Sequence, residues 1–231
     1  MYGLIGQPLF AFTPDTYVAW RQRPDVAYMV DAFYERNGMR GILCGMVADS
    51  SDLISRVPLR SLQELQASKL SAAGVYAIAM RHAGAAVQSN ARGELSSALK
   101  FQTIEAVEAF GARDMADLRL GDVAKYLYHP SNARPFVAND LWISRAVWNL
   151  FDSATQQAID RACASVVSSS LARTAEQNRA ALKELEGAGV SVQPLPSEIE
   201  DSMKAGWLRF AFGVASTNET YRRLLVTIPQ Q

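Results

Sequence analysis

The chain offers few side chains that could act as a nucleophile, a general base or a metal ligand. Its only histidines, His82 and His129, are far apart in the sequence, and neither is near a cysteine. A thiol nucleophile needs a neighbouring base, and a zinc site needs closely spaced histidines or cysteines. Glu105 and Glu108 would lie on opposite faces of the strand predicted over residues 104–110, so they form no obvious acid–base pair. Because the sequence also lacks a phosphate-binding loop, a dinucleotide fingerprint and a G-x-S-x-G elbow, we do not expect an enzyme.

The two cysteines, Cys44 and Cys163, could form at most one disulfide. The sequence alone cannot place them side by side, and Cys163 falls within a predicted helix. We interpret both as small buried apolar residues, a common role for cysteines without a reactive neighbour. This interpretation leaves the redox compartment of the protein open.

The charge balance argues against a nucleic-acid partner. The 231 residues include 23 Lys and Arg and 23 Asp and Glu, so the formal net charge is zero. A protein that binds nucleic acid usually carries a basic excess or stripe, and none is visible here. No segment approaches the roughly 18–20 apolar residues of a membrane-spanning helix. Residues 1–10 lack the basic and apolar regions of a secretory signal, so we expect no export signal in this chain.

Predicted helices and strands alternate along the chain. Apolar spacing and capping residues predict helices at residues 25–37, 61–65, 72–86, 94–101, 114–120, 152–186, 198–212 and 218–225. Short apolar runs predict strands at residues 40–47, 69–71, 104–110, 124–129 and 136–144. The clearest helix is 152–186, which Asp152 or Ser153 would cap. Since no hairpin turns join the strands, the sequence predicts an α/β fold with a mostly parallel sheet.

An ordered series of short segments resembles one family of receptors. The segments include Gly93-Glu-Leu, Ile104-Glu-Ala-Val-Glu108, Asp117-Leu-Arg-Leu-Gly121 and Ala124-Lys-Tyr-Leu-Tyr-His-Pro130. Further matches, from Trp20 upstream to Val192 downstream, fall in the same order. The series resembles the solute-binding receptors of TRAP transporters, the DctP-like family. It is most similar to the branch that binds 2-oxo acids and related monocarboxylates.

This resemblance implies a two-lobed α/β receptor, like the periplasmic binding proteins, with long connecting helices between lobes that close over a ligand. The family's N-terminal third has no counterpart in the chain, so we expect one lobe to be truncated. Residues 1–70 would be the remnant of the first lobe and the crossover. Residues 71–150 would form the second lobe with the crossover back, and residues 151–231 the long connecting helix and the C-terminal helices. The resemblance also implies a periplasmic location, a small organic anion as ligand and TRAP membrane permease subunits as partners, and it allows a dimer.

The residues expected to bind the ligand depart from the family pattern. Family members hold the ligand carboxylate with an arginine soon after the S-L-x-x-L turn, and the corresponding residue here is Ser71. A serine hydroxyl cannot replace the two parallel, charge-assisted hydrogen bonds of a guanidinium group. Glu108 is kept as a ligand-site and metal-site carboxylate, but the tryptophan that follows it in the family is Ala109.

A loop that supplies an aromatic wall and a metal contact in the family is also altered. Its tryptophan and glutamate correspond to Asn132 and Arg134. In the 2-oxo acid branch a cation, sodium or calcium, lies between protein carboxylates and the ligand. Since Arg134 removes a metal ligand and adds a positive charge, we predict metal-independent binding in which Arg134 pairs with Glu108 or with the anionic ligand. Gln102 and Ser50 are further candidates for ligand binding, because they fall in segments that face the cleft in the family.

Two other functions remain open at this point. The losses at Ser71, Ala109, Asn132 and Arg134 favour a degenerate relative that no longer binds the ancestral ligand and acts as an interaction or structural protein. In that case Arg134 would be a solvated loop residue. An enzyme that uses the cleft is the least favoured function, because the chain has neither a nucleophile–base pair nor a set of metal ligands.

Overall fold

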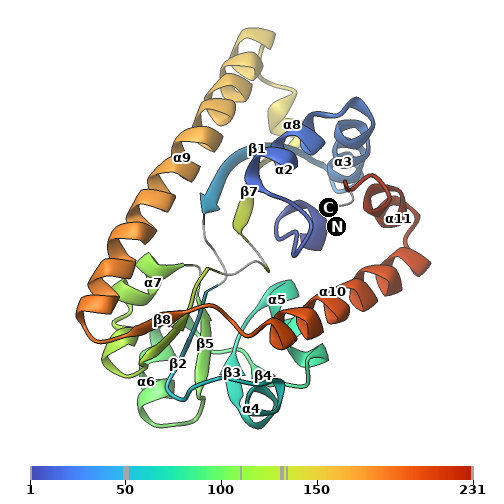
Figure 1. Ribbon diagram of the computed structural model, residues 1–231. Coiled ribbons are helices and arrows are strands. Elements are labelled where there is room, and N and C mark those ends of the chain that lie inside the picture. The colour runs from blue at the N-terminus through green and yellow to red at the C-terminus, as the bar shows by residue number, and fades with distance from the viewer. Residues whose placement is uncertain (1, 49–51, 110, 131–132, 134, 230–231) are drawn as a thin grey trace.

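The computed structural model describes residues 2–48, 52–109, 111–130, 133 and 135–229. A six-stranded sheet with its helices lies at one end of the molecule, and a two-stranded sheet with its helices lies at the other (Figure 1). The α-helices are α1 (Tyr2–Ile5), α2 (Pro14–Gln22), α3 (Pro24–Arg36), α4 (Leu62–Ala67), α5 (Gly74–His82), α6 (Leu95–Lys100), α7 (Ala112–Asp117), α8 (Arg145–Trp148), α9 (Ser153–Gly187), α10 (Ser197–Thr217) and α11 (Glu219–Leu225). The strands are β1 (Met39–Ala48), β2 (Asp52–Ser55), β3 (Lys69–Ser71), β4 (Ala86–Gln88), β5 (Ala106–Ala109), β6 (Tyr126–Tyr128), β7 (Phe136–Ser144) and β8 (Ser191–Gln193). Two short 3-10 helices are η1 (Arg92–Glu94) and η2 (Leu120–Asp122).

The larger sheet has the strand order β4-β3-β5-β2-β6-β8. Strand β3 runs parallel to β4 and β5, and β6 runs parallel to β8. Strand β2 is antiparallel to both of its neighbours, and β1 pairs antiparallel with β7 in the smaller sheet. The expected α/β class is confirmed, and the larger sheet is mixed because β2 enters its middle in the opposite direction.

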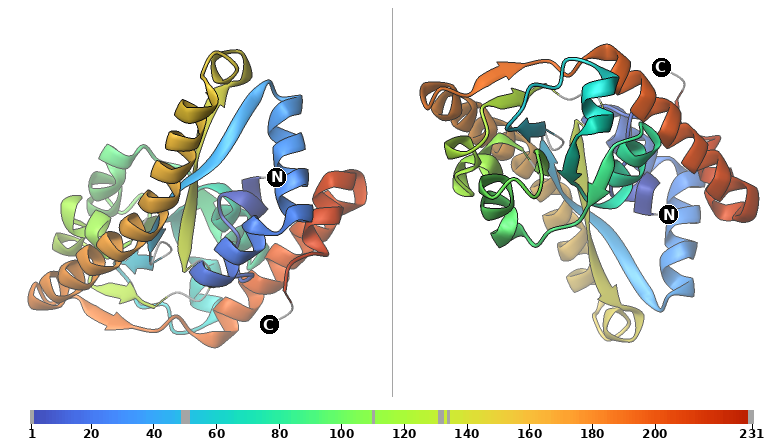
Figure 2. Two further views of the ribbon diagram at one scale, coloured as in Figure 1. Left: turned by 90° about the horizontal axis from the view of Figure 1, so that it is seen from above. Right: turned by 90° about the horizontal axis from the view of Figure 1, so that it is seen from below.

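The long helix α9 connects the two ends of the molecule and lies along β1 (Figure 2). Three of its polar side chains satisfy backbone groups of β1. The N–H of Met46 donates to Ser170 Oγ at 3.0 Å, and the N–H of Ala48 donates to Thr174 Oγ1 at 3.0 Å. Asn178 Nδ2 donates to the carbonyl oxygen of Ala48 at 2.9 Å. An edge strand normally exposes such groups, so α9 protects this edge of the small sheet.

Side-chain caps begin three helices at positions that the sequence predicts. Asp152, Ser61 and Asn218 each accept a hydrogen bond from the backbone N–H three residues later. Each cap satisfies one of the backbone donors that the first turn of a helix leaves unpaired. The predicted helix over 152–186 is confirmed as Ser153–Gly187.

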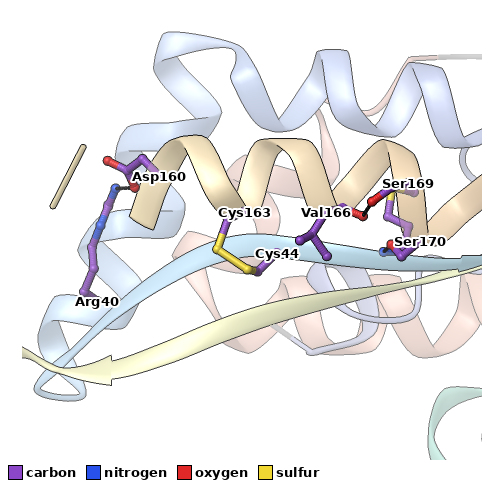
Figure 3. Close-up of a disulfide and its surroundings, with 8 residues drawn as sticks. Arg40, Cys44, Asp160, Cys163, Val166, Ser169 and Ser170 are labelled. Atoms are coloured by element: carbon purple, nitrogen blue, oxygen red, sulfur yellow. Dashed lines mark hydrogen bonds and ion pairs between the residues drawn. A yellow bond between two sulfur atoms is a disulfide. The ribbon is translucent and has the colours of Figure 1, made fainter. Parts of the chain in front are cut away.

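Cys44 in β1 and Cys163 in α9 form a disulfide (Figure 3). The interpretation of both cysteines as small buried apolar residues is therefore wrong. The two residues are 119 positions apart, and only the packing of α9 on β1 brings them together. An ion pair between Arg40 and Asp160 links the same two elements at 3.8 Å.

Several other elements differ from the sequence-based expectation. Helix α2 and strands β2, β4 and β8 were not predicted, because each is short and lacks a clear apolar period. All four residues of β5 are buried, so both faces of this strand are covered. Trp20, Trp148 and Trp207 pack in the interior, whereas Trp142 is 58 % exposed. The division into residues 1–70, 71–150 and 151–231 stays a prediction.

Helices α5 and α10 approach each other closely at Gly206. A Cβ atom at this position would lie 2.4 Å from the Cβ of His82 and 3.2 Å from the carbonyl oxygen of Ala79. We expect Gly206→Ala to lower the free energy of unfolding by about 1–3 kcal/mol, because the packed helices must move apart. A Cβ atom added to Gly213 in the same helix would meet no atom within 4 Å, so Gly213→Ala should be neutral or stabilising by up to about 1 kcal/mol. Urea denaturation of the two variants checks the pair, and equal stability would contradict the close approach.

Candidate functional site

Three of the residues predicted to bind the ligand meet at one cavity. Ser71 ends β3, and Glu108 and Ala109 end the parallel neighbour β5, so their strand ends lie at the same edge of the sheet. All three line a cavity of about 100 Å³. They are buried, with 4, 7 and 4 % of their surfaces exposed. The end of parallel strands is where ligands of open α/β sheets commonly bind.

The loop that follows β4 forms the opposite wall of this cavity. Ser89, Asn90 and Arg92 belong to this wall, and Leu95 and Leu118 add apolar surface. The predictions from the sequence do not include these residues. Strand β4 begins at the last residue of the helix predicted over 72–86, and only its parallel pairing with β3 brings the loop over the cavity.

Ser71 holds this loop in place. Its hydroxyl oxygen accepts a hydrogen bond from the backbone N–H of Asn90 at 3.3 Å. A backbone hydrogen bond also joins the neighbouring residue to this loop, since the N–H of Ala72 donates to the carbonyl oxygen of Gln88 at 3.1 Å. Ser71 thus has a structural contact of its own.

Arg92 supplies the positive charge of the cavity wall. Its Nη2 lies 2.5 Å from Asp114 Oδ1 on α7. The hydrogen bond with Asp114 raises the pKa of the Arg92 guanidinium above its usual value, although some burial opposes this effect. The arginine side chain is 52 % exposed, so it is both charged and reachable from solvent.

A second cavity of about 340 Å³ lies on the other side of Asp114, between the two ends of the molecule. Its walls come from the N-terminal segment, β1, β7, α7 and α9. The polar side chains among its lining residues are Gln7, Arg113, Asp114, Asn139, Thr174, Gln177 and Asn178. The N–H of Arg113 donates to Asn178 Oδ1 at 3.0 Å, which fixes α7 against α9. Since Asp114 lines this cavity and pairs with Arg92, the ion pair stands between the two cavities.

The other predicted site residues lie elsewhere or cannot be placed. Gln102 follows α6 with a positive φ of 61°, is exposed, and does not line the cavity of Ser71. Ser50, Asn132 and Arg134 fall outside the described residues. Within the described part of the chain no three or more His, Cys, Asp or Glu residues cluster as metal ligands. The role of Glu108 as a metal ligand therefore stays a prediction.

A larger cavity, of about 540 Å³, lies away from these residues. It lies between α2, α3, β1 and α9, and its walls are mostly apolar. The predicted ligand residues Ser71, Glu108 and Ala109 do not line it. We therefore place the candidate site at the ends of β3 and β5, where the predicted residues line the same cavity as Arg92.

None of the helices within the described residues has both the length and the apolar character needed to cross a membrane.

Comparisons with solved structures show the same fold in several receptors. A TRAP transporter solute-binding protein from Bordetella bronchiseptica RB50 matches with a TM-score of 0.89 and 21 % identity, over 98 % of this chain and 67 % of that protein. A TRAP periplasmic solute-binding protein from Pseudoalteromonas atlantica T6c matches with a TM-score of 0.85 and 16 % identity, over 96 % and 68 %. DctP7, an extracytoplasmic solute receptor from Bordetella pertussis, matches with a TM-score of 0.77 and 16 % identity, over 98 % and 74 %. These matches confirm the two-lobed receptor fold.

No curated protein matches the chain. The model of one protein family, however, matches residues 8–208, which is most of the chain. Its members are binding proteins for transport rather than enzymes, in agreement with the expectation from the sequence. The chain belongs to the DctP family, the bacterial extracellular solute-binding proteins of family 7.

Proposed function

We propose that this chain captures a small organic acid outside the cytoplasm and delivers it to the membrane subunits of a TRAP-type transporter. The observation that carries the proposal is the cavity at the ends of β3 and β5, whose lining residues include Arg92, Ser71 and Glu108. A guanidinium group is the side chain best suited to bind a carboxylate. The structural relatives support this class of ligand, because one was solved with picolinate and calcium, one with pyruvate and sodium, and one with malonate.

The size of the cavity favours a small monocarboxylate. Its volume of about 100 Å³ is the smallest of the three cavities described here. A 2-oxo or 2-hydroxy acid of three or four carbon atoms suits this volume better than a sugar acid. The 2-oxo acid branch of the family, which the sequence resembles, binds ligands of this size.

The disulfide supports an extracytoplasmic location. Disulfides persist in oxidising compartments such as the bacterial periplasm and are rare in the cytosol. The link between Cys44 and Cys163 therefore agrees with a receptor that works in the periplasm. The permease partner and a dimer remain proposals from the resemblance; the Bordetella bronchiseptica relative was itself solved as a dimer.

We expect pyruvate or lactate to raise the melting temperature of the purified chain. A ligand that binds only the folded state at about 100 times its Kd stabilises that state by about 2.7 kcal/mol. The measurement is a thermal-shift titration with pyruvate, lactate, malonate and picolinate, and the matched control is the uncharged amide of pyruvate. Each titration is run first in a sodium-free buffer that contains a chelator, and then with added calcium or sodium. If Arg134 replaces the metal, the shift should be the same in both conditions.

The competing function is a degenerate relative that binds no organic acid, which the serine at position 71 favours. It predicts a cooperative melting transition that none of the four acids shifts. That result, reproduced by calorimetric titration, would contradict the proposed function. A rise in melting temperature that occurs only with added cation would support the proposed function but contradict metal-independent binding.

A further inference from the structure

We infer that Arg92 binds the carboxylate of the ligand and that Ser71 positions the loop that carries Arg92. This inference rests on the proposed function, since it assigns the group that recognises the ligand at the same cavity. Arg92 is the one Lys or Arg among the described residues that line this cavity. Glu108 is the other charged residue among them, so Arg92 is the one lining residue that could pair with a ligand carboxylate.

The guanidinium group has donors left for a ligand. An arginine side chain carries five N–H donors in a planar fork. Within the described part of the chain, its hydrogen bond to Asp114 Oδ1 is the only one that Arg92 makes to another side chain. The remaining donors suffice for the two parallel hydrogen bonds of a bidentate arginine–carboxylate pair.

The backbone that carries Arg92 is fixed on both sides. On one side the N–H of Asn90 donates to Ser71 Oγ at 3.3 Å, and Gln88 Nε2 donates to Asn90 Oδ1 at 3.0 Å. On the other side the N–H of Glu94 donates to the carbonyl oxygen of Ala91 at 2.9 Å and closes the 3-10 turn η1. The hydroxyl of Ser71 thus determines how the loop lies over the cavity, which makes Ser71 a positioning residue.

Asp114 competes with the ligand for Arg92. Its carboxylate lies 2.5 Å from Nη2 and has the same chemistry as the group that the site would bind. Asp114 also lines the larger cavity between the two ends of the molecule. A ligand carboxylate would therefore share the guanidinium group with Asp114 or displace it, and weakening Asp114 should strengthen binding.

The test is calorimetric titration of pyruvate and lactate into the full chain and its variants. We expect Arg92→Ala to weaken binding of the better acid at least tenfold, and Arg92→Lys to weaken it less, because a lysine keeps the charge but not the fork. Arg119→Ala is the matched control, since Arg119 is 80 % exposed and pairs with Asp122 away from the cavity. This variant should bind as the original chain does. Asp114→Asn should bind a few times more tightly.

A second variant tests the positioning role of Ser71. Ser71→Ala removes the hydroxyl that accepts the hydrogen bond from the N–H of Asn90. We expect Ser71→Ala to weaken binding a few times in the original chain and to cause no further loss in Arg92→Ala, which has already lost the guanidinium group. Circular dichroism and melting of Arg92→Ala should match the original chain, because the side chain is half exposed.

The outcomes distinguish the inference from the proposed function. If the original chain binds neither acid, the proposed function fails and the inference fails with it. If the original chain binds and Arg92→Ala binds equally well, the inference alone is overturned. Loss of binding in Arg92→Ala, with no further loss when Ser71→Ala is added, supports both.

Discussion

Replacing Asp140 by alanine is expected to lower the free energy of unfolding by about 3–5 kcal/mol, because it leaves the guanidinium group of Arg21 buried without a counter-charge. The side chains of Arg21 and Asp140 are only 8 and 5 % exposed, and both Nη atoms lie 3.3 Å from Asp140 Oδ2. This pair joins α2 to β7, which are far apart in the sequence. The measurement is urea denaturation followed by circular dichroism.

Two tyrosines complete the buried cluster. The hydroxyl of Tyr34 donates to Asp140 Oδ2 at 2.5 Å, and Arg21 Nη1 donates to the hydroxyl oxygen of Tyr17 at 2.9 Å. Burial and the Asp140 carboxylate both raise the pKa of Tyr34, and burial raises the pKa of Tyr17 to about 12. Both tyrosines are therefore neutral donors at neutral pH, and Asp140→Ala removes the acceptor of Tyr34 as well as the partner of Arg21.

The control for this prediction removes both charges together. Arg21→Met combined with Asp140→Leu should cost much less than Asp140→Ala alone, since no unpaired charge stays buried. Asp122→Ala, which breaks the exposed pair with Arg119, should change the stability little. A loss below about 1 kcal/mol for Asp140→Ala would show that water reaches Arg21 and that the pair is not buried in solution.

Removing the disulfide is expected to lower the free energy of unfolding on the order of 4–5 kcal/mol. The cross-link joins residues that are 119 positions apart, and a long loop restricts the unfolded chain more than a short one. It also fixes α9 on β1 beside a small apolar cluster that includes Ile42 and Trp148. The variant is Cys44→Ala with Cys163→Ala, and the measurement is again urea denaturation.

Reduction provides the matched control for the disulfide. The original chain in dithiothreitol should unfold at the same urea concentration as the double alanine variant, and the oxidised chain at a clearly higher one. Mass spectrometry of the alkylated, unreduced protein should find neither thiol modified. Two reactive thiols in the native protein, or equal stability with and without reductant, would contradict the cross-link.

Much of the local structure could be predicted from the sequence. Helix α9 begins at the Asp152 cap and ends beside Gly189, and both signals lie within a few residues of the boundary. Helices α10 and α11 and the apolar strand β1 were found from the same kind of evidence. Short strands without apolar alternation, such as β4 and β8, carry no local signal and became visible only through their pairing.

The candidate site was predictable in part. Comparison with the family pattern indicated Ser71, Glu108 and Ala109, and the structure places these three around one cavity. Arg92 was not among the residues that this comparison indicated. Its position depends on the parallel pairing of β3 with β4 and on one hydrogen bond from Asn90 to Ser71.

The sequence by itself determined the α/β class, the main helices, the formal net charge of zero and the resemblance to solute-binding receptors. Periodicity and capping act over a few residues, so a linear pattern records them. The tertiary structure decided the contacts between distant segments, which include the mixed sheet, the Cys44–Cys163 disulfide, the buried pair of Arg21 and Asp140, and the place of Arg92. These features depend on which surfaces pack together when the chain folds, and residue spacing along the chain does not fix that choice.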